Sequence, residues 1–100
     1  MKKQLASILI TNFNKDKYLS NTINSCLAQN YKKKEILIFE DKSTDNSLKI
    51  LKKYKKIKVF INKKKKLTSG PLNQINGIKE LFKKSNGEII FLLDSDDCFK

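Results

Sequence analysis

The sequence contains no arginine, so all 22 of its basic residues are lysine, and the formal net charge is +12. Proteins that read nucleic-acid bases rely on the bidentate guanidinium of arginine, and binders of single strands need aromatic side chains on which bases stack. The lysine clusters at 32–34, 52–56 and 63–66 contain no aromatic residue except Tyr54. We therefore expect no nucleic-acid partner. A solvated surface, or contact with an anionic membrane or an acidic partner, stays open.

Long apolar runs and a disulfide or metal pattern are also missing. No run approaches the roughly 18 apolar residues that a membrane span needs. The first apolar run ends at residues 12–14 without a small-residue cleavage pattern, which favours a buried strand over a signal peptide. The two cysteines, Cys26 and Cys98, are far apart, and we interpret them as reduced thiols of a cytosolic protein. Peripheral attachment at the inner face of the membrane is an open alternative.

Glycine and proline are scarce, with three and one residues, and the sequence has no repeat and no flexible linker. Neither of the glycine-rich phosphate loops, GxxxxGKS/T or GxGxxG, is present, which excludes P-loop and dinucleotide-binding proteins. A chain of 100 residues is the size of one small domain with a single core. We therefore expect residues 1–100 to form one domain.

The sequence does contain short apolar runs that alternate with longer segments of helical period. The runs predict strands at 5–11, 35–39, 57–61 and 88–93. Helices are expected from Asp16, as the cap, to about residue 30, after residues 41–45, and from 70–71 to 86–87. Because crossovers of this length join parallel strands, the sequence predicts an α/β fold, a three-layer α/β/α arrangement with a mostly parallel sheet of about four strands.

Two of these helices have apolar residues at spacings of three and four, which predicts the faces that pack on the sheet. In the first helix they are Leu19, Ile23, Cys26 and Leu27. In the third helix they are Leu72, Ile75, Ile78 or Lys79, and Phe82.

Polar residues collect at three of the predicted strand ends, in the segments 11–14 (TNFN), 40–43 (EDKS) and 94–97 (DSDD). In open parallel sheets, ligands bind beyond the carboxyl ends of the strands. We therefore expect the three segments to meet at one binding site. Taken singly, each segment is equally typical of a turn or helix cap, a role that we expect of Asn14, Ser43, Thr44 and Asp45.

The residue types in these segments suit a nucleotide and a metal ion. Asp94 and Asp96 flank Ser95, and two close carboxylates repel each other unless a cation lies between them. Carboxylate oxygens suit Mg²⁺ or Mn²⁺, which keep waters and share ligands with a diphosphate. Phe13 could stack on a base, and Asp41 could accept a hydrogen bond from a base N–H.

Three stretches, ITNFNKDKYL, SCLAQNYKKKEILIFEDKSTDNSLKIL and NGEIIFLLDSDD, follow a pattern that resembles the family 2 glycosyltransferases with the GT-A fold. The resemblance covers nearly the whole chain. It implies an enzyme, a hexosyltransferase-like glycosyltransferase that binds a nucleotide sugar, UDP favoured, with Mn²⁺ or Mg²⁺. It further implies inverting transfer to the hydroxyl of an unknown glycan or lipid-linked acceptor, in the synthesis of surface polysaccharide or glycoconjugates.

The resemblance also assigns roles by position. Thr11, Asn12 and Phe13 lie where the family lines the base and ribose, with phenylalanine in place of the usual tyrosine. Asp41 lies where the family pairs with the base, beside Glu40 in place of an aspartate. In the D-x-D motif of Asp94, Ser95 and Asp96, the first acid tends to contact the ribose and the second holds the metal. That metal, by neutralising charge, would help the nucleoside diphosphate leave.

The sequence departs from the family pattern at two positions and shows no catalytic base. Lys42 stands where glycine is common, so the turn there is expected to differ. Gln74 stands where the family often has an arginine that contacts the donor. The base that activates the acceptor is expected downstream of Lys100, and Asp97 is not used so in the family. We therefore interpret the chain as the donor half of a transferase, either a fragment or a truncated gene product.

Two other functional hypotheses are open. A phosphatase of the haloacid dehalogenase type also has D-x-D after an apolar strand, but near the start of the fold and followed by Thr or Val, whereas Asp97 follows here. The second alternative is a non-catalytic, lysine-rich module that binds polyanions or an anionic membrane.

Overall fold

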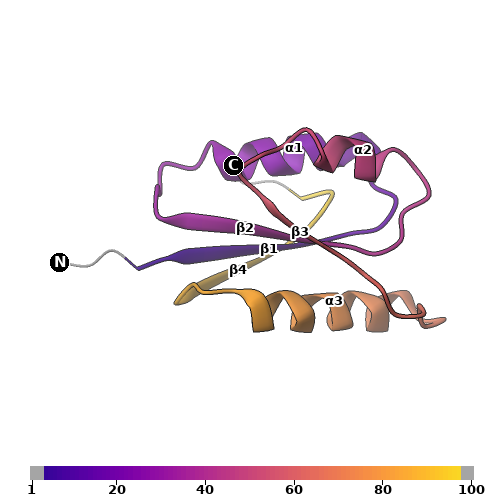
Figure 1. The fold of residues 1–100 in the computed structure, drawn as a ribbon. Helices are drawn as coiled ribbons and strands as arrows, with labels where there is room; N and C mark the ends of the chain where they lie inside the picture. Colours follow the sequence, from indigo (N-terminus) through magenta and orange to yellow (C-terminus); the bar gives the residue numbers. More distant parts are fainter. Residues whose placement is uncertain (1–3, 98–100) are drawn as a thin grey trace.

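The computed structural model describes residues 4–97, which form three layers around one sheet (Figure 1). The strands are β1 (Ala6–Asn12), β2 (Lys34–Glu40), β3 (Lys58–Ile61) and β4 (Ile89–Asp94). The helices are α1 (Asp16–Leu27), α2 (Ser47–Leu51) and α3 (Gly70–Lys84). All four strands are parallel, and α1 and α2 cover one face of the sheet while α3 covers the other. The predicted α/β/α fold is confirmed.

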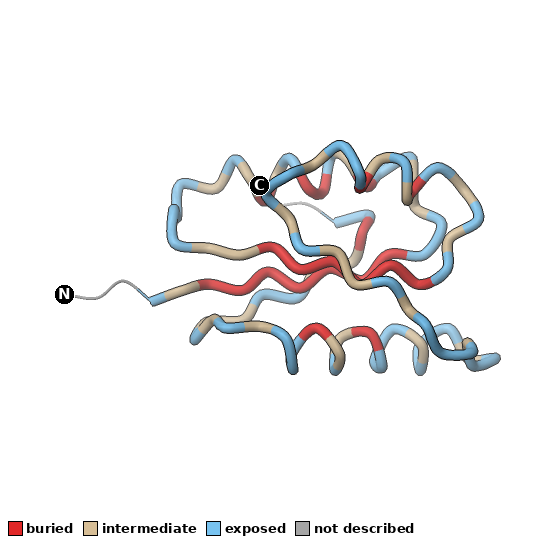
Figure 2. The backbone as a smooth tube through the Cα atoms, in the orientation of Figure 1, coloured by how far each residue is buried: buried red, intermediate tan, exposed pale blue. Residues whose placement is uncertain are grey.

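The strand order is β3-β2-β1-β4, so the chain reverses direction across the sheet at β1. All seven residues of β1 and the last five of β2 are buried, as Figure 2 shows in the middle of the sheet. Their continuous apolar runs suit strands that are covered on both faces. The switch point lies between β1 and β4, where open sheets of this kind bind ligands beyond their carboxyl ends.

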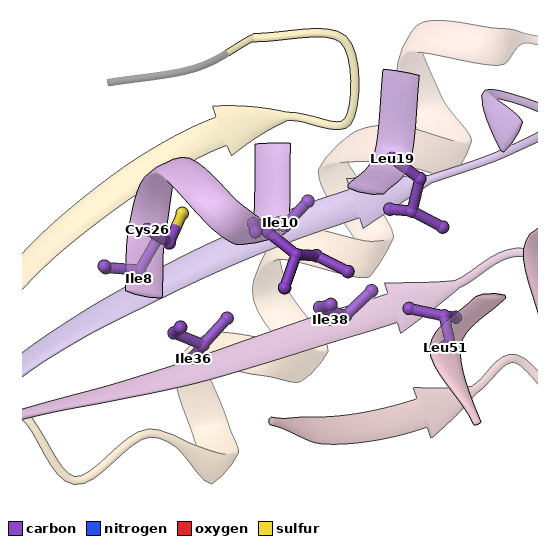
Figure 3. Packing of buried hydrophobic residues seen from close by; sticks show 8 residues of the cluster. Ile8, Ile10, Leu19, Cys26, Ile36, Ile38 and Leu51 are labelled. Atoms are coloured by element: carbon purple, nitrogen blue, oxygen red, sulfur yellow. The ribbon is translucent and has the colours of Figure 1, made fainter. Parts of the chain in front are cut away.

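The sheet packs against its helices through two separate clusters. The larger one lies under α1 and α2 (Figure 3) and consists of Ile8, Ile10, Leu19, Ile23, Cys26, Ile36, Ile38 and Leu51. The smaller one lies above α3 and consists of Leu9, Leu37, Phe39 and Leu81. Burial raises the pKa of the Cys26 thiol to about 11, so this thiol is neutral near pH 7 and unreactive. Cys98 lies outside the described residues.

The prediction for the buried face of α3 was wrong for Leu72, Ile75 and Phe82, which are 51%, 47% and 60% exposed. Gly77 and Leu81 are buried instead. A Cβ at Gly77 would lie 2.6 Å from the Phe39 ring, so this glycine lets α3 approach the sheet closely. The glycine therefore determines the rotation of the helix, and the apolar spacing does not.

Helix α1 also differs from the prediction at both of its ends. It ends at Leu27 rather than near residue 30, and Asp16 is its first residue rather than its cap. Lys15 occupies the cap position and makes no capping hydrogen bond through its side chain. None of the helices within residues 4–97 is long and apolar enough to cross a membrane.

Candidate functional site

A cavity of about 340 Å³ opens at the carboxyl edge of the sheet. Five of the seven predicted site residues line it: Thr11, Asn12, Phe13, Asp41 and Asp94. They come from the ends of β1, β2 and β4, so the structure brings these three strand ends together around one cavity. Ser95 and Asp96 do not line the cavity. The cavity is completed by Phe39, Lys15, Lys66, Leu67, Thr68, Gly70, Asn73 and Gln74.

Glu40 joins the ends of β1 and β2 beneath this cavity. It is fully buried and accepts hydrogen bonds from the Asn12 side-chain amide at 2.8 Å and from the Ser43 backbone N–H at 2.8 Å. The Ser43 hydroxyl donates to the same carboxylate. A buried carboxylate with several donors is satisfied and rigid. Glu40 therefore holds the backbone on either side of Asp41 in place.

The loops after β1 and β2 hold each other through reciprocal hydrogen bonds. The Asn14 side-chain oxygen accepts from the Thr44 and Asp45 backbone N–H groups at 2.7 and 3.3 Å, and the Asn14 N–H donates to the Ser43 hydroxyl at 3.0 Å. Asp45 accepts from the Asp16 N–H at 3.0 Å, at the start of α1. These residues thus make the hydrogen bonds expected of turn and cap residues, and these bonds join the two loops.

The Asp45 carboxylate also accepts from the Ser47 N–H at 2.9 Å. Burial raises the pKa of Asp45, but the hydrogen bonds from Ser47 and Asp16 outweigh it and bring the pKa below its usual value. Asp45 is therefore ionised at neutral pH, where it satisfies free N–H groups at the first turns of both α1 and α2.

Asp41 lies almost fully buried at the wall of the cavity. The Asn62 side chain donates to it at 2.8 Å, and the Lys66 ammonium lies 3.6 Å from its other oxygen. The same ammonium lies over the Phe13 ring, 3.1 Å from the ring centre, in a cation–π contact. Lys66 thus occupies the space between the two side chains that are predicted to hold a base.

Asn62 and Lys66 were not among the site residues predicted from the sequence. Asn62 directly follows β3, so it is a fourth polar strand end, and the rule that identified the other three would have found it. Lys66 carried no such signal, because it is the last of four consecutive lysines in a loop. Only the folded arrangement separates it from its neighbours.

The acidic segment 94–97 forms a tight turn after β4. The Asp97 N–H donates to the Asp94 carbonyl at 2.9 Å, and the Asp97 carboxylate accepts from the Asp94 N–H at 3.0 Å. Asp94 also accepts from the Ser95 N–H at 2.8 Å through its carboxylate. Ser95 is fully buried, and its hydroxyl has no hydrogen-bond partner within the described residues. Any contact of Ser95 with a ligand would therefore involve its backbone.

Asp96 is exposed, and its carboxylate lies 3.7 Å from the ammonium of Lys15, a residue of the cavity wall. An exposed ion pair of this kind contributes little stability, so a metal ion could displace the lysine at small cost. Residues 4–97 contain no group of three or more acidic, cysteine or histidine side chains that could enclose a metal. A Mg²⁺ or Mn²⁺ ion held by Asp94 and Asp96 would have to take its remaining ligands from water and a diphosphate.

Comparisons with known proteins point to one family. The model of the family described as "Glycosyl transferase family 2" matches residues 7–100. An uncharacterized glycosyltransferase of Nostoc sp. is 35% identical over 94 residues, which are 94% of this chain and 29% of that protein. The chain thus spans less than a third of the length of that relative.

Solved structures show the same relationship. Poly(ribitol-phosphate) beta-N-acetylglucosaminyltransferase TarS of Staphylococcus aureus is 30% identical over 94 residues, covering 91% of this chain and 16% of TarS. Its structure in complex with UDP-GlcNAc superposes with a TM-score of 0.73, over 93% of this chain and 27% of that one. A mannosyltransferase of Pyrobaculum calidifontis, in complex with GDP-Man and Mn²⁺, shares the fold with a TM-score of 0.79 at 12% identity, over 98% of this chain and 29% of that one.

Proposed function

Because the chain belongs to the family 2 glycosyltransferases, we propose that its cavity binds a nucleotide sugar together with a divalent metal ion, for transfer of the sugar to an acceptor hydroxyl. The observation that carries the proposal is the meeting of Phe13, Asp41 and Asp94 around one cavity at the switch point of the sheet. These residues lie 28 or more positions apart in the sequence, and each comes from a different strand end. A UDP sugar is the favoured donor, since TarS has been solved with UDP-GlcNAc.

The base would lie against Phe13, with Thr11 and Asn12 beside the base and ribose. Stacking on an aromatic ring contributes about 1–3 kcal/mol per base in other nucleotide sites. A base N–H donates to Asp41, whose orientation Asn62 fixes. The incoming base takes the place of the Lys66 ammonium over the ring, which leaves this lysine free to face the negatively charged phosphates.

Asp94 and Asp96 would hold Mn²⁺ or Mg²⁺, with Asp94 also within reach of the ribose. When bound, the metal neutralises charge on the diphosphate and so assists its departure as the leaving group. Lys15, which lines the cavity and pairs with Asp96, adds a positive charge near the same phosphates. Gln74 lines the cavity where the family often has an arginine, and Lys15 and Lys66 can supply the positive charge that Gln74 lacks.

The role proposed for residues 1–100 is donor binding in an inverting transferase. No residue among them is assigned as the base that activates the acceptor. The acceptor would be a glycan or lipid-linked hydroxyl in surface polysaccharide or glycoconjugate synthesis. The relative TarS is named as a poly(ribitol-phosphate) beta-N-acetylglucosaminyltransferase. A cytoplasmic location, with peripheral contact to an anionic membrane through surface lysines, belongs to the same proposal.

Calorimetry with UDP, with and without Mn²⁺, tests the donor site. UDP should bind more tightly when Mn²⁺ is present, and Asp96→Ala should weaken that binding by more than about 10-fold, which corresponds to 1.4 kcal/mol. Glu88→Gln is a matched control, because Glu88 is an exposed acid at the opposite end of β4 and should change nothing.

Metal-independent UDP binding that ignores Asp96 would count strongly against the donor site. A lysine-rich module that binds polyanions would instead show binding that weakens steeply with salt and is indifferent to Asp96.

A further inference from the structure

Helix α1 carries one polar side chain on the face that it buries against the sheet. Thr22 is 1% exposed and lies on that face with Leu19, Ile23 and Cys26. Its hydroxyl oxygen lies 2.7 Å from the Ser95 carbonyl oxygen and 2.5 Å from the Asp97 carbonyl oxygen. Thr22 therefore joins α1 to the acidic turn after β4 across more than 70 residues of sequence.

These two carbonyls belong to the residues on either side of Asp96. A hydroxyl has one proton to donate, so the Thr22 hydroxyl donates to one of these two carbonyls at a time. Both sides of the turn therefore depend on the same donor. A β-branched residue in a helix has few rotamers, which keeps the Thr22 hydroxyl near the turn. The Tyr18 carbonyl one turn earlier, at 3.2 Å, is a third and more distant acceptor for the same proton.

Little else in the described residues holds the turn from outside. Asp94 and Asp97 bond to each other within it, and the Ser95 side chain, although buried, makes no hydrogen bond. The Lys15–Asp96 ion pair is exposed and long. Without the Thr22 hydroxyl, the buried Ser95 carbonyl would lose a close donor, which is costly in a buried setting.

We propose that Thr22 is a positioning residue, which fixes the backbone around Asp96 so that this carboxylate faces the metal. The inference rests on the proposed donor site. Thr22 does not touch the ligand, and acts only through the turn that carries Asp96. Groups that orient a metal ligand without contacting the metal typically change the metal affinity by about 10–100-fold.

The test compares Thr22→Val, which keeps the shape and removes the donor, with Thr22→Ser, which keeps the hydroxyl. The measurement is the dissociation constant of UDP by calorimetry in the presence and absence of Mn²⁺, and the quantity of interest is the ratio of the two. Thr22→Val should reduce the Mn²⁺ enhancement by about 10-fold or more while leaving metal-free UDP affinity unchanged. Thr22→Ser should keep most of the enhancement.

Circular dichroism establishes that each variant is folded, and Thr22→Ala is a second hydroxyl-free variant should valine not fit. An unchanged Mn²⁺ enhancement in a folded, hydroxyl-free variant would overturn the assignment of Thr22. Equal weakening of UDP affinity with and without Mn²⁺ would overturn it too, since that pattern indicates a general structural role. Absence of any Mn²⁺ enhancement in the unmutated chain would overturn the donor site itself, and the Thr22 inference with it.

Discussion

Lys42 has a left-handed backbone conformation, with φ at 58°. This conformation costs a residue with a Cβ about 1–2 kcal/mol, whereas glycine adopts it freely. The neighbouring hydrogen bond from the Ser43 N–H to Glu40 holds the turn in this shape. The lysine therefore occupies the backbone conformation that suits glycine, the residue common here in the family. A lysine at this position thus strains the turn beside Asp41.

Lys42→Gly should therefore raise the free energy of unfolding by about 0.5–1 kcal/mol, because the relieved strain exceeds the added entropy of the unfolded chain. Urea denaturation measures this difference. Lys56→Gly is the matched control, since Lys56 is exposed and has no positive φ, and it should be destabilising by about the same amount. If Lys42→Gly lowers stability, the lysine side chain makes contacts that outweigh its strain.

Five of the thirteen residues that line the cavity were predicted from the sequence, for a reason that follows from parallel sheets. Thr11, Phe13, Asp41 and Asp94 lie at or directly after the carboxyl ends of β1, β2 and β4, and parallel strands bring these ends to one edge. Lys66 and Thr22 could not be found in this way. Lys66 reaches Asp41 from a loop, and Thr22 reaches the acidic turn from within a helix face that reads as apolar core.

At the scale of elements, the close contact between α3 and β2 involves Phe39, a residue that also lines the cavity. Gly77 faces the Phe39 ring, and Phe39 lines the cavity with its neighbours Asp41 and Phe13. An added methyl group at Gly77 would have to displace the ring. The order and approximate bounds of the helices and strands were predictable from apolar runs and turn residues, whereas the rotation of α3 depends on this one contact between distant residues.

Gly77→Ala should lower the free energy of unfolding by about 1–3 kcal/mol, because the new Cβ overpacks the interface with Phe39. Chemical denaturation measures the loss. Gly70→Ala, in the same helix, is the matched control, because nothing lies within 4 Å of the Cβ that it would add. The double variant Gly77→Ala with Phe39→Leu should recover part of the stability. If it recovers none, the clash with the ring is not the cause.

At the scale of the whole molecule, one carboxylate joins all the strands at the edge opposite the cavity. Glu35, on β2, accepts hydrogen bonds from the Ser7 hydroxyl on β1 and from the Asn86 N–H just before β4, both at 2.6 Å. It also accepts from the Lys58 ammonium on β3 at 2.9 Å. The Gly87 N–H donates to the same Ser7 hydroxyl at 2.8 Å. In a chain with net charge +12, Glu35 is one of the few negative charges, and it links β2 to β1, to β3 and to the segment that leads into β4.

The protonation of Glu35 should therefore control the acid stability of the fold. Burial raises the pKa of Glu35, but the hydrogen bonds from Ser7, Asn86 and Lys58 outweigh it, so its pKa in the folded protein lies below the unfolded value of about 4.3. A lowered pKa means that the ionised form stabilises the fold. That contribution is complete above the unfolded pKa and is lost as the pH falls through the folded pKa.

Glu35→Gln tests this by removing the charge while keeping the size of the side chain. At pH 7 the variant should lose about 1–2 kcal/mol of the free energy of unfolding, which is typical of hydrogen bonds to a charged group. The difference from the unmutated protein should shrink below about pH 4, where the native carboxylate also becomes protonated. Urea denaturation at a series of pH values measures both quantities, with the exposed Glu88→Gln as the control. A difference that stays constant across this pH range would mean that the charge of Glu35 does not contribute, and that its hydrogen bonds alone join the strands.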